Sequence, residues 1–193
     1  MKSASRLTIS TSALCLLLLF MPAQALGQAA PPKLSIRTNL LYWSAVLPNI
    51  GLEYRPSENF GMLLNGGWNH FTWKDEYSHA RTYFVQAEVR RYLGEGKHWF
   101  IGLEGHAGQF NLKLSKDKDG TQGDCYGAGL TGGYRLRLSR AFDMDFSLGL
   151  GYTHLKYEKY YRSNGVFVRK DSNLKKDFFG PSQVGISLIW KLK

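Results

Sequence analysis

Apolar side chains alternate with small or polar ones along most of the chain between Leu34 and Lys193. A period of two places successive side chains on opposite faces of a β-strand, whereas an amphipathic helix requires a period near 3.6. The segment 142–152 is the clearest case, because its even positions are all apolar and its odd positions are aspartate, serine or glycine. Residues 126–138 and 183–192 repeat the pattern. The sequence therefore predicts an all-β fold.

Between the alternating segments, short connections alternate with longer ones along the chain. The short turns lie at 56–59, 94–97 and 139–141, and the longer connections at 74–80, 116–124 and 159–177. The short connection at 45–48 is the exception. Short turns at one end and longer loops at the other are typical of outer-membrane barrels. We predict an eight-stranded antiparallel up-and-down transmembrane β-barrel, with strands near residues 34–45, 49–56, 60–72, 81–93, 98–113, 125–138, 142–158 and 179–192.

Residues 1–29 have the organisation of a secretory signal peptide. A basic start precedes the apolar run 13–21, which is too short to span a bilayer as a helix. Cleavage is expected after Ala25 or Ala29, leaving residues 30–193 as a single outer-membrane barrel domain. Cleavage removes two cations and no anion, so the net charge falls from +10 to +8. Cys125 stays as the only cysteine of the mature chain. No disulfide is therefore expected.

The two faces of the expected sheet differ in chemistry. The apolar face carries aromatic residues mostly toward strand ends, as membrane-interface girdles require. These residues are Trp68, Tyr83, Trp99, Phe100, Tyr126, Phe142, Tyr152 and Trp190. We therefore expect lipid outside and a polar lumen, although a soluble periplasmic, lipocalin-like barrel that binds an apolar ligand would alternate in the same way.

Four acids and four arginines share the polar face, in the strand halves nearer the short turns. Buried charges persist when they are paired and hydrogen-bonded, so these residues predict a plug that closes the lumen. The expected network consists of Arg37, Glu53, Glu88, Arg90, Glu104, Arg135, Arg137 and Asp145. The other half of the lumen is rich in glycine, which either leaves a pocket or only permits curvature while aromatic neighbours fill the space.

No residue pattern predicts catalysis, a metal site or a cofactor. The histidines lack zinc spacing, and the segment 116–124 lacks the full ligand set of an EF-hand. An enzyme that modifies outer-leaflet lipid is the alternative, with His70 near Thr72, or His154 near Thr153 and Glu158, as its base.

The long connections are basic and suit contact with outer-membrane lipid and lipopolysaccharide phosphates. Export and the dispersed cations argue against nucleic acid as a partner. The connection 159–177 mixes aromatic and basic residues, and its Ser163-Asn164-Gly165 suggests a hairpin above the membrane. The expected contact residues are Tyr160, Tyr161, Arg162, Phe167, Arg169 and Lys170.

The last expected strand resembles the signal that the barrel-assembly machinery reads in outer-membrane proteins. Gln183, Gly185, Leu188 and Trp190 occupy its polar, glycine, hydrophobic and aromatic positions. Residues 191–193 follow the aromatic residue, whereas many barrels end on it.

Three stretches carry a wider resemblance: 37–42 with 48–53, 105–111, and 180–181 leading into 185–188. Together they resemble an uncharacterised outer-membrane β-barrel family of anaerobic Gram-negative bacteria, known as a domain of unknown function. The resemblance implies an eight-stranded barrel, an outer-membrane address and no particular activity. It also implies a fimbrial or other surface protein as a possible partner. We therefore expect a non-catalytic barrel with a structural or surface-interaction role.

Overall fold

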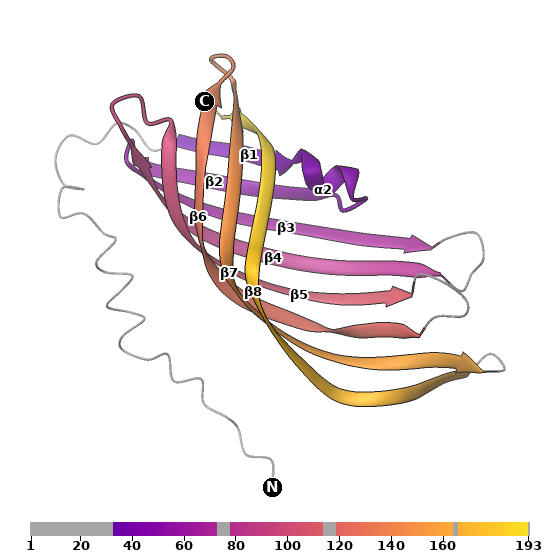
Figure 1. Cartoon of the computed structure of the whole chain (residues 1–193). Coiled ribbons are helices and arrows are strands. Elements are labelled where there is room, and N and C mark those ends of the chain that lie inside the picture. The colour runs from indigo at the N-terminus through magenta and orange to yellow at the C-terminus, as the bar shows by residue number, and fades with distance from the viewer. Residues whose placement is uncertain (1–32, 73–77, 114–118, 164–165, 193) are drawn as a thin grey trace, which may run out of the picture.

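The computed structural model describes residues 33–72, 78–113, 119–163 and 166–192. The expected signal peptide lies outside these ranges. Eight antiparallel strands follow one another in chain order and form a closed ring, in which β8 pairs with β1 (Figure 1). The all-β expectation and the number of strands are confirmed.

The strands lengthen along the chain. Their bounds are β1 Lys33–Asn39, β2 Asn49–Ser57, β3 Phe60–Thr72, β4 His79–Leu93, β5 Trp99–Lys113, β6 Gly120–Arg137, β7 Phe142–Ser163 and β8 Val166–Lys191. The segment 159–177 is therefore mostly strand rather than a long loop, since β7 and β8 stay paired up to Ser163 and Val166.

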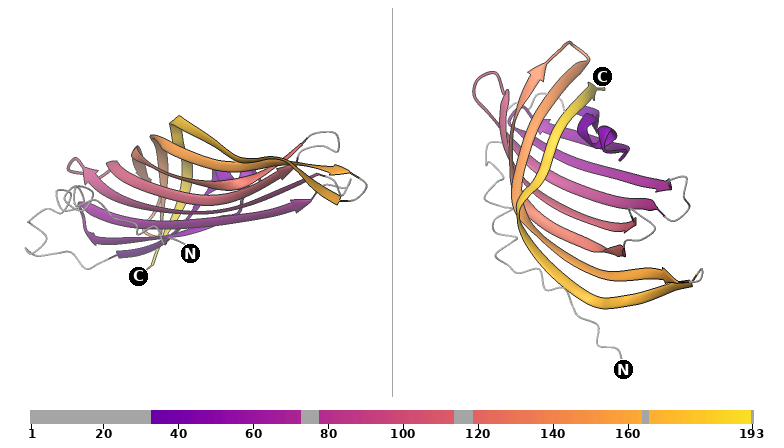
Figure 2. Two further views of the ribbon diagram at one scale, coloured as in Figure 1. Left: turned by 90° about the horizontal axis from the view of Figure 1, so that it is seen from below. Right: turned by 45° about the vertical axis from the view of Figure 1, so that its right-hand side comes forward.

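All eight strands close the ring only in the half that carries the short turns. There β1 pairs with β8 from Ser35 opposite Lys191 to Asn39 opposite Ser187. In the other half β1 and β2 have ended, whereas β3 to β8 continue past them as a curved sheet (Figures 1 and 2).

A short helix, α2 (Leu40–Ser44), replaces the end of the expected first strand. Asn39 causes this change, because its side chain accepts a hydrogen bond from Leu41 N at 3.1 Å and so caps the helix. The same side chain also accepts from Ile186 N at 3.2 Å and donates to Val184 O at 3.1 Å, so it bonds the edge of β8. Among the described residues, no helix is long and apolar enough to cross a membrane.

The interior of the ring is polar and its outer face is apolar. Charged residues such as Arg90, Glu53 and Asp145 have no exposed surface, whereas Trp99 is 62% exposed and Leu130 is 65% exposed. The expected aromatic residues lie on this outer face with one exception. Phe100 is buried inside, where the guanidinium of Arg90 lies 4.0 Å from its ring centre.

Candidate functional site

Arg135 on β6 lies at the centre of the buried charges. Its guanidinium donates to both carboxylate oxygens of Asp145 at 2.6 and 2.9 Å, and to both oxygens of Glu53 at 2.9 and 2.7 Å. The phenol of Tyr92 adds a third hydrogen bond to Glu53 at 2.6 Å. Paired, two-pronged hydrogen bonds of this kind fix both the position and the orientation of the charged groups.

Arg90 on β4 forms the second centre. It donates to both oxygens of Glu88 at 2.6 and 2.9 Å and to Asp145 at 2.6 Å. Thr131 donates to Glu88 at 2.5 Å. Asp145 therefore joins the two arginine centres across the ring.

Arg37 on β1 completes the cluster. Its Nη2 donates to Ser187 Oγ at 3.0 Å, and its Nη1 lies 3.6 Å from Asp145 Oδ2. With Arg90, Arg135 and three carboxylates, the cluster has a formal charge of zero. We name these six residues the charge network: Arg37, Glu53, Glu88, Arg90, Arg135 and Asp145.

Two expected members are not part of the charge network. Glu104 is buried but bonds His106 Nδ1 at 3.1 Å and Gln86 at 3.5 Å rather than an arginine. Glu88 lies directly across β4 and β5 from Glu104, and two adjacent carboxylates turn toward different partners. Arg137 is exposed near the end of β6 and donates to Gly96 O at 2.9 Å, because the strand end carries its side chain past the interior.

Two groups that hydrogen-bond the charge network, Tyr92 and Thr131, were not expected from the sequence. Tyr92 follows Glu88 and Arg90 at the same spacing of two, so alternation could have placed it inside. Thr131 likewise shares its face with Arg135.

Neighbouring side chains fill the space beside the interior glycines. A Cβ added at Gly67 would lie 2.3 Å from the ring of Phe84, and one at Gly127 would lie 2.7 Å from His106 Nε2. Of the two alternatives for these glycines, the filled interior agrees with this packing at both positions.

The expected contact residues of the β7–β8 hairpin differ in exposure. Tyr160 is 6% exposed, and its hydroxyl donates to Asn111 at 2.6 Å and lies 3.1 Å from His79 Nε2, so its role as an exposed contact is wrong. Tyr161 is 41% exposed. Arg169 pairs with Glu158 at 2.9 Å and Lys170 with Asp119 at 2.7 Å. The side chains of Arg162 and Phe167 lie outside the described part of the structure.

The two histidines considered as catalytic bases have different surroundings. His70 is exposed on β3. His154 Nδ1 bonds Asp177 Oδ1 at 2.5 Å, while Thr153 bonds His106 instead. In the described ranges, no group of three or more His, Cys, Asp or Glu residues could hold a metal ion.

The residues of the expected assembly signal lie on both faces of β8. Gln183 is buried and donates to Ser147 Oγ at 3.2 Å, and Gly185 shares its face. Leu188 and Trp190 lie on the other face of β8, where Trp190 stacks on Phe142 with ring centres 6.4 Å apart.

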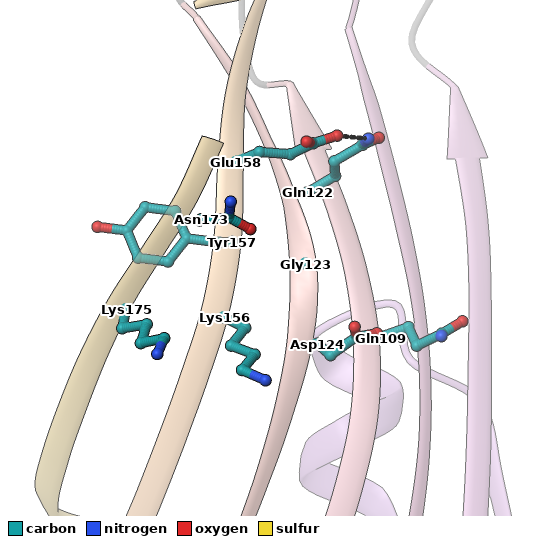
Figure 3. Close-up of a pocket in the computed structure, with 9 residues that line it drawn as sticks. All are labelled: Gln109, Gln122, Gly123, Asp124, Lys156, Tyr157, Glu158, Asn173 and Lys175. Atoms are coloured by element: carbon teal, nitrogen blue, oxygen red, sulfur yellow. Dashed lines mark hydrogen bonds between the residues drawn. The ribbon is translucent and has the colours of Figure 1, made fainter. Parts of the chain in front are cut away.

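An open polar cavity of about 790 Å³ is lined by residues of β5 to β8 (Figure 3). By the pairing of its strands it belongs to the outer face, further from the short turns than Tyr126 and Tyr152. Lys156 and Lys175 are direct partners on β7 and β8, and their side chains point the same way in Figure 3. Asp124 and Gln109 continue the same row on β6 and β5. We name this cavity the outer pocket; the other residues that line it are Gln122, Gly123, Tyr157, Glu158 and Asn173.

The chain belongs to the family described as "Protein of unknown function (DUF3575)", whose family model matches residues 11–192. No curated protein and no solved structure matches the chain.

Proposed function

We propose that this member of a family of unknown function is a small, non-catalytic barrel of the outer membrane of a Gram-negative bacterium. A cleaved signal peptide exports it, and its outer end has a structural or surface-interaction role. Lipopolysaccharide and other outer-membrane lipids surround it, and the barrel-assembly machinery inserts it. Its proposed partner is a fimbrial or other surface protein.

The inverted distribution of polarity carries this proposal. A soluble barrel buries apolar side chains and exposes charged ones, but here Glu53, Arg90 and Asp145 are fully buried while Trp68 and Leu148 are 56% and 54% exposed. An outer face of this kind is stable when hydrocarbon covers it. The closed ring also leaves no unpaired strand edge in the half that carries the short turns.

The aromatic residues on the outer face support the same orientation. Trp99, Phe142 and Trp190 lie near the short turns, and Trp68, Tyr83, Tyr126 and Tyr152 lie about ten residues further along their strands. Two such levels match the two interfaces of a bilayer. The outer pocket would then lie outside the cell.

The charge network supports a plugged lumen rather than a pore. Its three arginines and three carboxylates balance one another in charge and are buried in the interior together with Tyr92 and Phe100. An ion crossing this layer would have to displace hydrogen bonds of 2.6 to 2.7 Å between buried charges.

Membrane fractionation with gel mobility tests the proposal. We expect the native protein in the outer-membrane fraction, with a band whose mobility changes on boiling because a closed barrel resists detergent at room temperature. Recovery in the soluble periplasmic fraction would overturn the proposal and favour the lipocalin-like ligand binder.

A lipid-modifying enzyme is the second candidate, and the bond between His154 and Asp177 favours it. A carboxylate that orients a histidine ring supports that histidine as the base that activates a nucleophile. The readout is the mass of lipid A after incubation with the purified protein. A mass change that His154→Ala abolishes would establish the enzyme, and unchanged lipid would support the non-catalytic barrel.

A further inference from the structure

An apolar groove of about 780 Å³ adjoins the outer pocket, and Gln109 and Asp124 line both. Trp68, Tyr83 and Tyr126, each more than half exposed, form its aromatic wall. A Cβ added at Gly66 would meet nothing closer than the carbonyl oxygen of Phe84 at 3.6 Å, so internal packing does not require a glycine there. We name this hollow the outer groove.

One row of paired residues joins the outer groove to the outer pocket. Across β3 to β8 this row reads Trp68, Tyr83, Gln109, Asp124, Lys156 and Lys175. Its chemistry thus changes from aromatic through amide to charged along a single outer surface. A ligand that matches the whole row must have an apolar part and a polar, charged part.

The polar end suits an anionic headgroup that carries hydroxyls. Lys156 and Lys175 are both exposed and supply two ammonium groups side by side. The charge of Glu158 is offset by Arg169 at 2.9 Å, and Gln122 donates to the same carboxylate at 2.5 Å. Asp124 and the amide groups of the pocket can bond sugar hydroxyls, because they supply both donors and acceptors.

We propose that the outer groove and the outer pocket together bind a phosphorylated glycolipid of the outer leaflet. An acyl chain lies along the groove, and the phosphorylated sugar lies against Lys156 and Lys175. This inference rests on the proposed membrane location, in which the groove lies at the outer edge of the apolar belt and the lysines lie just beyond it. A lipid that stands in the bilayer would then present its headgroup at the level of the pocket.

The test measures which lipids the full-length protein in detergent micelles retains from mixtures of diphosphorylated lipid A and phosphatidylethanolamine, by native mass spectrometry. We expect preferential retention of lipid A. Replacing both lysines, as Lys156→Glu with Lys175→Glu, should lower that retention about tenfold or more. Lys33→Glu with Arg140→Glu makes the same charge change near the short turns and should leave retention unchanged.

The groove has its own matched pair of variants. Ala107→Phe fills the outer groove and should weaken lipid A retention, whereas Ala87→Phe adds the same ring to an exposed position of β4 outside the groove and should not. Equal retention of both lipids, or equal losses in the test and control variants, would overturn the inference.

Gel mobility of the same samples separates the two proposals. A heat-modifiable protein that retains both lipids equally contradicts the lipid site and leaves the barrel proposal standing. A protein that stays in solution without detergent overturns both.

Discussion

Arg135 and Asp145 are direct partners across β6 and β7, and two hydrogen bonds of 2.6 and 2.9 Å join their side chains. Asp145 also accepts from Arg90 at 2.6 Å, and Arg37 lies 3.6 Å away. One carboxylate thus faces all three arginines of the charge network. All three arginines are buried, so removal of the Asp145 charge would leave each of them with one carboxylate fewer nearby.

Asp145→Asn should strongly destabilise the ring. The amide keeps the size of the side chain but leaves three buried arginines with two carboxylates, and breaking a buried pair in this way costs about 3 to 5 kcal/mol. Urea unfolding of the protein in detergent measures the loss. Glu95→Gln removes one carboxylate from an exposed turn and should change the free energy of unfolding by less than about 0.5 kcal/mol. Equal midpoints for Asp145→Asn and the wild type would show that the network does not stabilise the fold.

Gly132 and Gly133 are neighbours on opposite faces of β6, and they should respond differently to alanine. A Cβ at Gly133 would lie 2.2 Å from the carbonyl oxygen of Phe146 and 2.4 Å from the ring of Phe100, whereas the nearest atom to one at Gly132 is 3.9 Å away. Gly133→Ala should therefore destabilise the protein by about 1 to 3 kcal/mol through overpacking. Gly132→Ala should be neutral or slightly stabilising. Unfolding midpoints compare the two variants directly, and a similar effect of both would contradict the assignment of the faces.

Asn39 holds the junction of β1, α2 and β8, and Asn39→Ala should loosen it. The substitution removes one hydrogen bond to the amide of Leu41 and two to the edge of β8. We expect a loss of about 1 to 3 kcal/mol, because partly buried backbone groups lose their partners. Hydrogen exchange should accelerate at the amides of Leu41 and Ile186 and stay unchanged at Leu64 in the centre of β3. Uniform acceleration at all three would indicate global destabilisation instead.

The alternation of side chains was sufficient to predict the strands and most of the interior, because one polar face and one apolar face require a period of two. The continuation of β7 and β8 through 159–177 was not predictable in this way. In that region neither face is uniformly apolar, and pairing between the strands maintains the extended backbone without a periodic signal.

The partners within the interior depend on register, which the sequence does not contain. Glu88 and Glu104 both lie in the interior and carry the same charge, yet of the two only Glu88 bonds an arginine. Their strands place them directly opposite each other, and Glu104 bonds His106 instead. The helix α2 was missed for a related reason. Its start depends on hydrogen bonds from Asn39 to residues about 145 positions away on β8.

Tyr160 should make the outer end of the β7–β8 hairpin sensitive to alkaline pH. Burial raises the pKa of its phenol, and the nearby charge of Arg81 only partly opposes this effect. The unfolded phenol titrates near pH 10, so its contribution to stability is complete below that pH and is lost as the pH rises through the higher pKa of the folded state. The same ionisation would remove the hydrogen that Tyr160 donates to Asn111.

The measurement is the tyrosinate absorbance of the wild type minus that of Tyr160→Phe, titrated from neutral pH upward. The difference should show one phenol that ionises above pH 10 in the folded protein and near pH 10 in urea. Tyr160→Phe should also lose less resistance to urea than the wild type as the pH rises above 10, because it has no phenol to ionise. A difference curve that is identical in the folded and unfolded protein would contradict the burial of Tyr160 and return it to the exposed contact surface expected from the sequence.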